Sequence, residues 1–271
     1  MENYVNDGAA VLSKDNIASI DEMIVTAVAR LPASAVVDIM PITKTAGPSI
    51  YWIEPWYQEN KIKLISTTLA MDDNASQRRL SFTAHAAENL RHVYTPESFT
   101  KTVQNWVMWY KFERQRKQLI DILTGPVISL LTPITLGINL ADNATQDETN
   151  AVESAIMQAI TSLRRRFKLG DMDFSVVGPY EISWAVLQLQ AKIPGKIHYM
   201  GDDTIDKVYV FPTGSGNMSR AGFGLFEYAD TIQSAYDSDT GEEVYFYYNR
   251  SVVALNPVHT AEPIVEVISL A

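Results

Sequence analysis

The pattern of hydrophobic and polar positions changes its period several times along the chain, and each period predicts one kind of element. Apolar residues three and four positions apart predict helices, whereas alternating or unbroken apolar runs predict strands. The helical pattern covers about 17–30, 96–124, 147–168 and 179–189, and 78–94 is predicted to be a short helix or a helix-like connection. Strand-like runs cover 35–42, 49–57, 61–71, 127–140, 173–178, 207–211, 225–229, 242–248, 251–255 and 263–270. This order is mixed α and β, without regular strand–helix alternation and without internal repeats.

The longest predicted helix has clear signals at both ends. Thr95 is a good N-cap residue, and Pro96 suits the first helical position. Gly125 and Pro126 end the helical pattern. About 28 residues at 1.5 Å each span roughly 40 Å, which exceeds the usual length of a helix in a compact domain. We therefore expect this helix to serve as a spine.

A second well-signalled helix covers 147–168. Val152, Ile156 and Ile160 give it an apolar face, and we expect Gly170 to close it. Its last turn holds three consecutive arginines, at positions 164 to 166. Compensation of the helix dipole and ion pairing between subunits are the favoured roles for these cations, and contact with nucleic acid is the alternative.

Two strand-like runs, 49–57 and 61–71, flank a short polar turn and predict a long hairpin. A two-stranded ribbon is marginally stable in water, and this one carries two tryptophans and two tyrosines between positions 51 and 57. Another surface must therefore cover it. From the residues alone, a hairpin folded onto its own core is the more common arrangement, because large exposed apolar patches are rare on monomers. An arm that lies on another copy of the chain is the alternative.

Composition narrows the possible functions. The chain has 271 residues, 46% of them hydrophobic, so it can bury a sizeable core. Its formal charge of −10 disfavours a general nucleic-acid binder, and the absence of cysteine excludes disulfides and thiolate chemistry. No apolar run is long enough to span a membrane, and the first residues lack the order of a signal peptide, so we expect a soluble protein made in a cytoplasm.

No pattern in the sequence supports catalysis, a cofactor or a metal site. The glycines at 213–217 are not followed by the lysine and hydroxyl residue of a phosphate-binding loop. The acidic stretch 237–243 lacks the spacing of a calcium loop and favours a hairpin turn. No Gly-x-Ser-x-Gly elbow is present. No two of the histidines have the spacing that places two ligands on one helical face: His85, His92, His198 and His259.

Several loose motifs occur in the order typical of one family. Asp38 and Ile39 precede the hairpin, a basic mixed stretch at 78–94 follows it, and the spine helix starts at Pro96. Downstream come DFSVVGPYEISWAVL, KVYVFPTGSG, GFGLFEYA and a run ending in SVVALNP. The chain thereby resembles the major capsid proteins of tailed bacteriophages, which have the HK97 fold, and is closest in look to the head proteins of contractile-tailed phages (myoviruses).

The resemblance implies an α+β fold with named parts. An N-terminal arm and first strand would occupy 1–41, and the extended hairpin, or E-loop, would occupy 42–77. The peripheral (P) domain with the spine helix would combine 78–130 and 250–271, and the axial (A) domain would be 131–249. The short region before the first predicted helix leaves open whether the N-terminus is matured by cleavage.

The resemblance further implies a structural protein without catalytic activity or cofactors. Copies would assemble into hexamers and pentamers of an icosahedral head that encloses phage DNA, so the expected location is the virion capsid, after assembly in the host cytoplasm. Scaffold, portal, vertex and decoration proteins are possible further partners, DNA would meet the inner face without sequence specificity, and no membrane is involved. Expected contact residues between subunits are aromatic and basic: Trp52, Trp56, Tyr57, Lys61, Lys63, Arg78, Arg79, Arg164 and Arg165.

Three alternatives stay open. An encapsulin-like nanocompartment has the same fold and would enclose a protein cargo in place of DNA. A minor vertex protein of the same fold is the second alternative. The third comes from a different class, a monomeric soluble binding module whose hairpin folds onto its own core.

Overall fold

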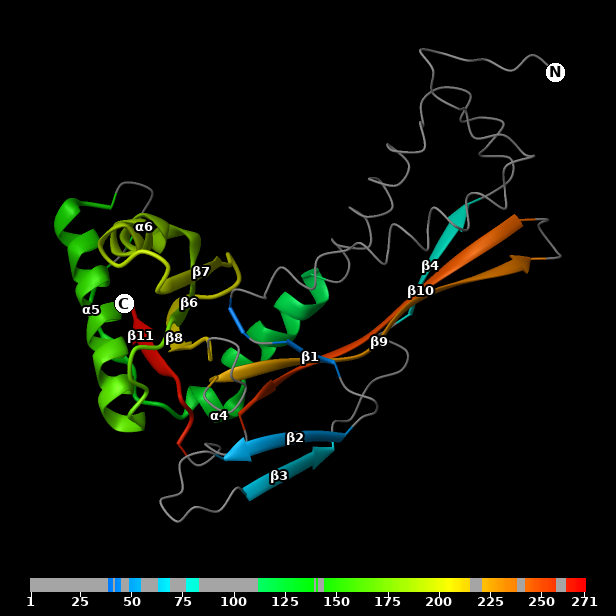
Figure 1. Ribbon diagram of the computed structural model, residues 1–271. Coiled ribbons are helices and arrows are strands. Elements are labelled where there is room, and N and C mark those ends of the chain that lie inside the picture. Colours follow the sequence, from blue (N-terminus) through cyan, green and yellow to red (C-terminus); the bar gives the residue numbers. More distant parts are fainter. Residues whose placement is uncertain are drawn as a thin grey trace. The chain divides into compact units, whose positions relative to one another are not determined.

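The computed structural model describes a set of ranges that together hold most of the chain from residue 112 onward (Figure 1). These ranges are 39–40, 42–44, 49–54, 63–68, 77–82, 112–138, 140, 144–214, 221–237, 242–256 and 262–271. The described residues belong to two compact units. The larger unit draws on 35–69, 115–226 and 252–271, and the smaller unit draws on 70–114 and 227–251.

A five-stranded sheet with the order β5-β11-β8-β6-β7 forms the centre of the larger unit. β6 pairs in parallel with β7 and antiparallel with β8, while β11 pairs antiparallel with β8 and in parallel with β5. The bounds of these strands are β5 Ile134–Thr135, β6 Phe174–Gly178, β7 Ile197–Gly201, β8 Lys207–Pro212 and β11 Glu266–Ser269. The C-terminal segment therefore lies inside a sheet whose other strands come from 134–212.

Both faces of this sheet are buried at its central strands, which explains why β6 and β8 are almost continuously apolar in sequence. In β8, Val208 and Val210 join one hydrophobic cluster, whereas Tyr209 and Phe211 join another. In β11, Ile268 likewise joins the first cluster, whereas Val267 joins the second. Because successive side chains of a strand point to opposite faces, the two clusters lie on the two sides of the sheet.

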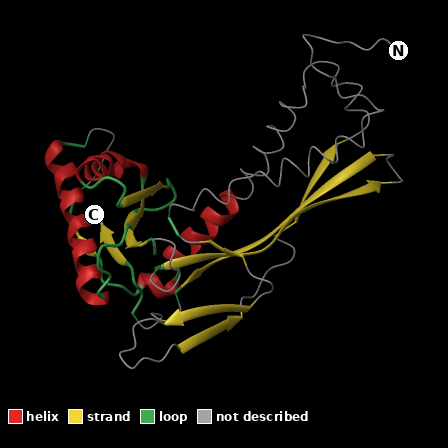
Figure 2. Cartoon of the chain, in the orientation of Figure 1, coloured by secondary structure: helices red, strands yellow, loops and turns green. Residues whose placement is uncertain are grey.

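Helices α5 (Gln146–Phe167) and α6 (Ser183–Lys192) supply the helical part of the first cluster. α5 packs on β8 and β11, α6 packs beside β7, and the two helices contact each other (Figure 2). The buried residues of α5 keep helical spacing along one face, from Val152 through Ile156 and Ile160 to Leu163. The predicted helices at 147–168 and 179–189 are thus confirmed, the second of them entered through a short 3-10 turn, η3 (Tyr180–Ile182).

Helical residues 112–123 contribute to the second cluster through Leu119 and Leu123, both fully buried. The predicted end of the long helix is confirmed, because Gly125 lies in a bend and Pro126 opens the short helix α4 (Pro126–Ser129). The Thr124 hydroxyl donates to the Ile120 carbonyl at 2.9 Å in the last turn. The predicted start at Pro96 lies outside the described residues, as does the helix predicted over 17–30.

A second sheet has the order β1-β9-β10-β4, with β4 antiparallel to β10. Its strands are β1 Ile42–Lys44, β4 Gln77–Phe82, β9 Phe223–Asp237 and β10 Glu242–Leu255. β9 extends beyond the predicted run 225–229 at both ends. β10 joins the two runs that were predicted separately, 242–248 and 251–255, into one strand. β2 (Ser49–Glu54) and β3 (Lys63–Thr68) pair antiparallel as a sheet of their own, which confirms the predicted pairing of these two runs.

The structure corrects five local predictions. The short helix or helix-like connection predicted over 78–94 is a strand, β4, in its described residues. Ile39 and Met40 form a buried turn, so the strand predicted over 35–42 is wrong at its described end, and β1 begins later. The buried strand predicted over 127–140 is a short helix followed by only two strand residues. Pro133 cannot donate to a ladder and Gly137 has a φ of 66°, and both shorten strand pairing there. β7 was not predicted, because its sequence IHYMG mixes polar and small residues.

The fifth correction concerns the end of α5. Gly170 was expected to close this helix, but Lys168 adopts the left-handed conformation, with φ 50° and ψ 44°. The backbone N–H groups of Lys168 and Leu169 both donate to the Arg164 carbonyl, so the orphan carbonyl at the helix end is satisfied. Gly170 also has positive φ, two residues after Lys168.

Candidate interaction surfaces

The N-terminus of α5 is fixed by a capping box. The Thr145 hydroxyl accepts from the Glu148 N–H at 3.3 Å, and the Thr145 N–H donates to Glu148 Oε2 at 2.7 Å. The hydrogen bonds from the Thr145 backbone and hydroxyl lower the pKa of Glu148. This helix therefore starts at a defined residue, and its outer side chains have a defined position.

Arg164, predicted as a contact residue between subunits, is occupied within its own chain. Its Nη2 donates to the Met172 carbonyl at 3.2 Å and lies 3.8 Å from Asp171 Oδ1. Its guanidinium carbon lies 5.3 Å from the centre of the Phe174 ring. These contacts join the last turn of α5 to the start of β6, which gives Arg164 a structural role inside the subunit.

Arg166 forms the centre of a second intramolecular network. Its Nε lies 3.2 Å from Glu262 Oε1, and its Nη1 lies 3.2 Å from Glu266 Oε1. Glu266 Oε1 also accepts from the Ser162 hydroxyl at 2.8 Å. The network attaches one flank of α5 to β11, so two of the three consecutive arginines serve the fold of their own chain.

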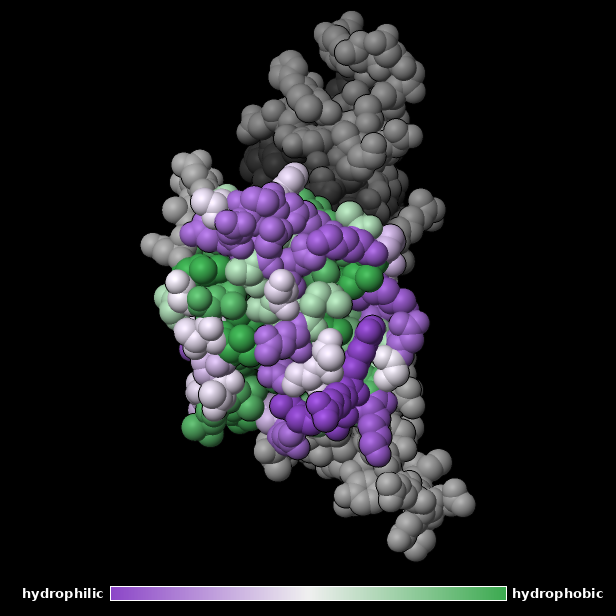
Figure 3. Space-filling view, turned by 90° about the vertical axis from the view of Figure 1, so that its left-hand side faces the viewer, coloured by the Kyte–Doolittle hydropathy of each residue, from purple (hydrophilic) through white to green (hydrophobic). Residues whose placement is uncertain are grey.

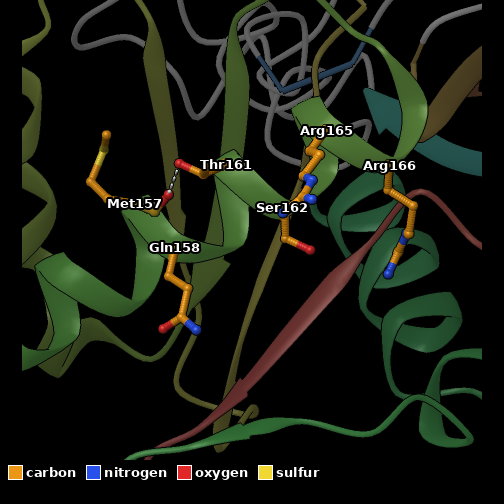
Figure 4. A pocket seen from close by; sticks show the side chains of 6 residues that line it. All are labelled: Met157, Gln158, Thr161, Ser162, Arg165 and Arg166. Carbon is orange, nitrogen blue, oxygen red and sulfur yellow. Dashed lines mark hydrogen bonds between the residues drawn. The ribbon is translucent and has the colours of Figure 1, made fainter.

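Arg165 differs from both neighbours. It is exposed, and among the described residues no carboxylate lies within ion-pair distance of its guanidinium. It lines an open hollow of about 730 Å³ on the outer side of α5, hereafter the α5 hollow, whose residues are Met157, Gln158, Thr161, Ser162, Arg165 and Arg166. Figure 4 shows these side chains along one side of the helix, with the two arginines at one end and Met157 at the other.

An exposed apolar stripe runs along α6 and the η3 turn before it, and sequence reasoning did not single it out. Tyr180 is 50% exposed, Trp184 60% and Leu187 55%, and Ala191 is also exposed. These four residues, hereafter the α6 stripe, follow one another at spacings of four, three and four, which is the seam spacing of packed helices. The sequence does contain a signal for this stripe. Ile182, Val186 and Leu189 form one apolar face, which is buried, and the stripe residues form a second apolar face at helical spacing.

Tyr180 holds a fixed place at the start of the stripe. Arg116 Nη2 donates to its hydroxyl at 3.2 Å, and a Cβ added at Gly201 would lie 2.5 Å from its ring. Arg116 also donates from Nε to Asp202 Oδ2 at 2.7 Å and from Nη2 to the Gly201 carbonyl at 3.2 Å. The ring is therefore ordered before any partner binds, which lowers the entropic cost of using it in a contact.

α5 and α6 are also fixed to each other at the opposite end of α6. Lys192 Nζ lies 2.5 Å from Glu153 Oε1. The lysine side chain is exposed and the glutamate side chain is mostly buried. The two helices therefore present the α5 hollow and the α6 stripe from one helical layer. The space-filling view in Figure 3 shows apolar side chains exposed between hydrophilic ones on the face seen there.

The other predicted contact residues are distributed over different elements. Trp52 lies in β2 opposite Ile65, and Lys63 lies in β3 opposite Glu54. Arg78 and Arg79 lie in β4, opposite Tyr247 and Phe246 of β10. Trp56, Tyr57 and Lys61 lie outside the described residues. The proposed contact made by this set thus stays a prediction.

Within the described ranges, no group of His, Asp and Glu side chains is suited to hold a metal ion. Among the helices that the structure describes, none combines the length and the apolar character needed to cross a bilayer. His198 lies in β7, where it is half-buried. The loop at 213–217 is described only to Gly214, which has a φ of 83°, and the turn at 238–241 lies outside the described residues.

Comparisons with known proteins support a fold and not a sequence family. No family model matches the chain, and no curated protein matches it. Among solved structures, a virus-like particle from Pyrococcus furiosus matches with a TM-score of 0.54 and 12% identity, over 92% of this chain and 96% of that chain. An encapsulin complex from Synechococcus elongatus matches with a TM-score of 0.52 and 9% identity, over 89% and 88%.

The mature capsid of bacteriophage PhiM1 gives a third match, with a TM-score of 0.52, 9% identity and coverage of 89% and 88%. The three similarities extend over nearly the whole of each chain, so they concern the complete arrangement of elements and not one shared motif. The chain therefore has the HK97-type fold of capsid and encapsulin shell proteins, as its order of elements predicted.

Proposed function

We propose that this protein is a shell subunit that self-assembles into hexamers and pentamers of a closed particle, the icosahedral head of a tailed bacteriophage. The observation that carries the proposal is the likeness in fold, over about nine tenths of each chain, to proteins solved as a virus-like particle, an encapsulin complex and a mature phage capsid. A fold of this kind works through contacts between copies, so the function is structural and requires no catalytic residue or cofactor.

The β2–β3 pair gives a physical reason for association. In the part of the chain that the structure describes, these strands pair only with each other. A two-stranded ribbon gains too little burial to be stable alone in water. We propose that the hairpin, about 42–77, lies over the adjacent subunit and that Trp52, Trp56 and Tyr57 are buried there. Lys61, Lys63, Arg78 and Arg79 would pair with acidic groups across the same contact.

The proposal assigns the remaining parts of the chain to the domains that the resemblance implies. We propose an N-terminal arm over 1–41, a peripheral domain over 78–130 and 250–271, and an axial domain over 131–249 around the ring centre. The five-stranded sheet with α5 and α6 would be the body of the axial domain, and β11 joins that sheet from the C-terminal segment.

The proposal also covers partners and location. Packaged DNA would meet the inner face without sequence specificity, in keeping with a chain of formal charge −10 that lacks the excess of cations typical of nucleic-acid binders. Scaffold, portal, vertex or decoration proteins would join the shell, and the mature protein would be part of the virion after assembly in the host cytoplasm.

An encapsulin-like nanocompartment is the second candidate. It is favoured by one specific observation, since one of the three similar structures is an encapsulin complex and another is a virus-like particle. The two candidates differ in contents, because a nanocompartment encloses a protein cargo and a phage head encloses DNA.

Electron microscopy of the full-length protein, combined with analysis of particle contents, tests both candidates. Closed shells support the shell function, and nuclease-resistant DNA in particles from the native source supports the phage head. A co-purifying protein cargo without DNA would favour the nanocompartment. A chain that remains monomeric with and without a scaffold protein would contradict both.

A further inference from the structure

The α6 stripe has the properties of a packing face without a partner in its own subunit. Scattered exposed apolar residues are normal, but bulky residues in succession at helix-seam spacing are typical of a contact. Trp184 and Leu187 lie on the side of α6 opposite its buried residues Val186 and Leu189. Tyr180, at the start of the stripe, is already held in place by Arg116.

The α5 hollow is complementary to this stripe in shape and chemistry. It is open, and its lining includes Met157, Thr161 and Arg165, whose side chains all carry apolar carbon atoms. Such a lining accepts an aromatic or aliphatic side chain while a charged group remains at one end. The hollow lies on α5 and the stripe on α6, so the two surfaces are different patches of one chain.

The charged residues indicate which end of the α6 stripe would meet which end of the α5 hollow. Glu181 is exposed next to Tyr180, and Asp203 is exposed one residue after the Asp202 that binds Arg116. Among the described residues, neither acid is within ion-pair distance of a cation. The acidic end of the stripe therefore matches Arg165, a cation without an ion-pair partner in the described part of an acidic chain.

We propose that neighbouring copies in a ring dock through these two surfaces, with the α6 stripe of one copy seated in the α5 hollow of the next and Glu181 facing Arg165. The inference rests on the proposed shell function and specifies one of its contacts. Two different patches that bind each other make a heterologous contact, which generates rings when the rotation closes. The occupant of the stripe is thus a second copy of this chain.

Reversal of charge tests the pairing directly. Glu181→Arg and Arg165→Glu each place like charges face to face, and each raises the protein concentration needed for assembly about tenfold or more. The double variant restores the attraction with opposite signs, and it assembles close to the wild-type concentration. Lys168→Glu is the matched control, since it makes a like change of charge at the same helix end, outside the hollow, and leaves assembly unchanged.

Mixing the two single variants gives a sharper result. The stripe of the Glu181→Arg variant carries a cation and faces the hollow of the Arg165→Glu variant, which carries an acid, and the reverse contact is also attractive. A mixture in equal amounts therefore forms alternating rings with an even number of subunits. Hexamers assemble and pentamers do not, so the mixture gives rings or sheets without closed icosahedral shells, as seen by electron microscopy and light scattering.

Trp184→Ser tests the apolar half of the contact and weakens assembly without changing the far-ultraviolet circular dichroism or the melting temperature of the subunit. Val127→Ser, a similar change at an exposed apolar residue of α4, is the control. Wild-type shells together with unchanged assembly of the folded single variants would overturn the inference and leave the shell function intact. Defective single variants whose double variant is equally defective, or a stripe that binds the stripe of its partner, would also overturn the inference. A wild-type chain that never assembles would overturn both.

Discussion

Arg116 and Asp202 join two segments far apart in sequence through a hydrogen bond of 2.7 Å from Nε to Oδ2. The Asp202 side chain is only 4% exposed, and its other oxygen, Oδ1, accepts from the backbone N–H of Thr204 at 2.8 Å. The pair fixes the helical residues 112–123 to the end of β7, and through Tyr180 it also fixes the start of the α6 stripe. A single ion pair thus positions a surface that we propose to be a contact.

Removal of this pair should destabilise the subunit in a pH-dependent way. Burial tends to raise the pKa of Asp202, but the hydrogen bonds from Thr204 and Arg116 outweigh it and hold the pKa below its usual value. A carboxylate with a lowered folded-state pKa stabilises the fold above its unfolded pKa of about 4 and loses this contribution as the pH falls further. Asp202→Asn should therefore cost about 1–3 kcal/mol at neutral pH.

Urea unfolding of wild type and Asp202→Asn between pH 7 and pH 3 measures this difference. The gap between the two proteins should be largest at neutral pH and should shrink as the pH falls below about 4. A gap that is the same at every pH would show that the aspartate acts through shape and not through charge.

Gly201→Ala should displace the Tyr180 ring. An added Cβ would lie 2.5 Å from Cδ1 and 2.6 Å from Cε1 of Tyr180, and the ring cannot rotate away while its hydroxyl accepts from Arg116. We expect a loss of about 1–3 kcal/mol in stability, as for other overpacked positions. Thermal unfolding measures the loss, and the double variant with Tyr180→Ala should recover most of it. A double variant no more stable than Gly201→Ala would contradict this account.

Lys168→Gly should stabilise the subunit. Lys168 has a left-handed backbone conformation that costs a residue with a Cβ roughly 1 kcal/mol, and glycine adopts it without that cost. Equilibrium urea unfolding should show a gain of about 0.5–1 kcal/mol. A lower stability of the glycine variant would mean that the Lys168 side chain contributes more than its backbone costs.

Trp52→Ala combined with Trp56→Ala tests the role of the hairpin. If the aromatic residues of this segment are buried against a neighbouring subunit, the double variant should stay a folded monomer and fail to form particles. Circular dichroism and size-exclusion chromatography separate the two effects. An unfolded monomer would show that the tryptophans belong to the core of their own subunit, as the monomeric alternative requires.

Much of the fold was predictable from periodicity, because a helix or strand that buries one face has apolar residues at a regular spacing. α5 has one apolar face and strong end signals, and the prediction of 147–168 differs from the observed helix by one residue at each end. The unbroken run at β8 indicated a buried strand, and the two clusters on either side of it explain why.

The failures have local causes. The hydrophobicity of 127–140 was visible in the sequence, but Pro133 and Gly137 interrupt the segment. The type of element that the backbone forms there could therefore not be predicted. β7 carries half-buried and polar residues. It forms a strand because it lies beside β6 and pairs with it, not because its residues favour strands. Tertiary context decided these segments.

The candidate surfaces were less predictable than the fold. Arg164 and Arg165 are adjacent and have the same charge, yet one is held by Met172 and Phe174 and the other is exposed. The sequence could not separate them, because the difference depends on residues that arrive from β6. The exposure of Trp184 likewise depends on which face of α6 meets the sheet.

Negative-stain electron microscopy of the full-length protein, purified with and without a scaffold protein, is the sharpest test of shell formation by this chain. We expect hexameric and pentameric rings that close into shells of uniform size. Homogeneous monomers under every assembly condition would contradict the proposed function.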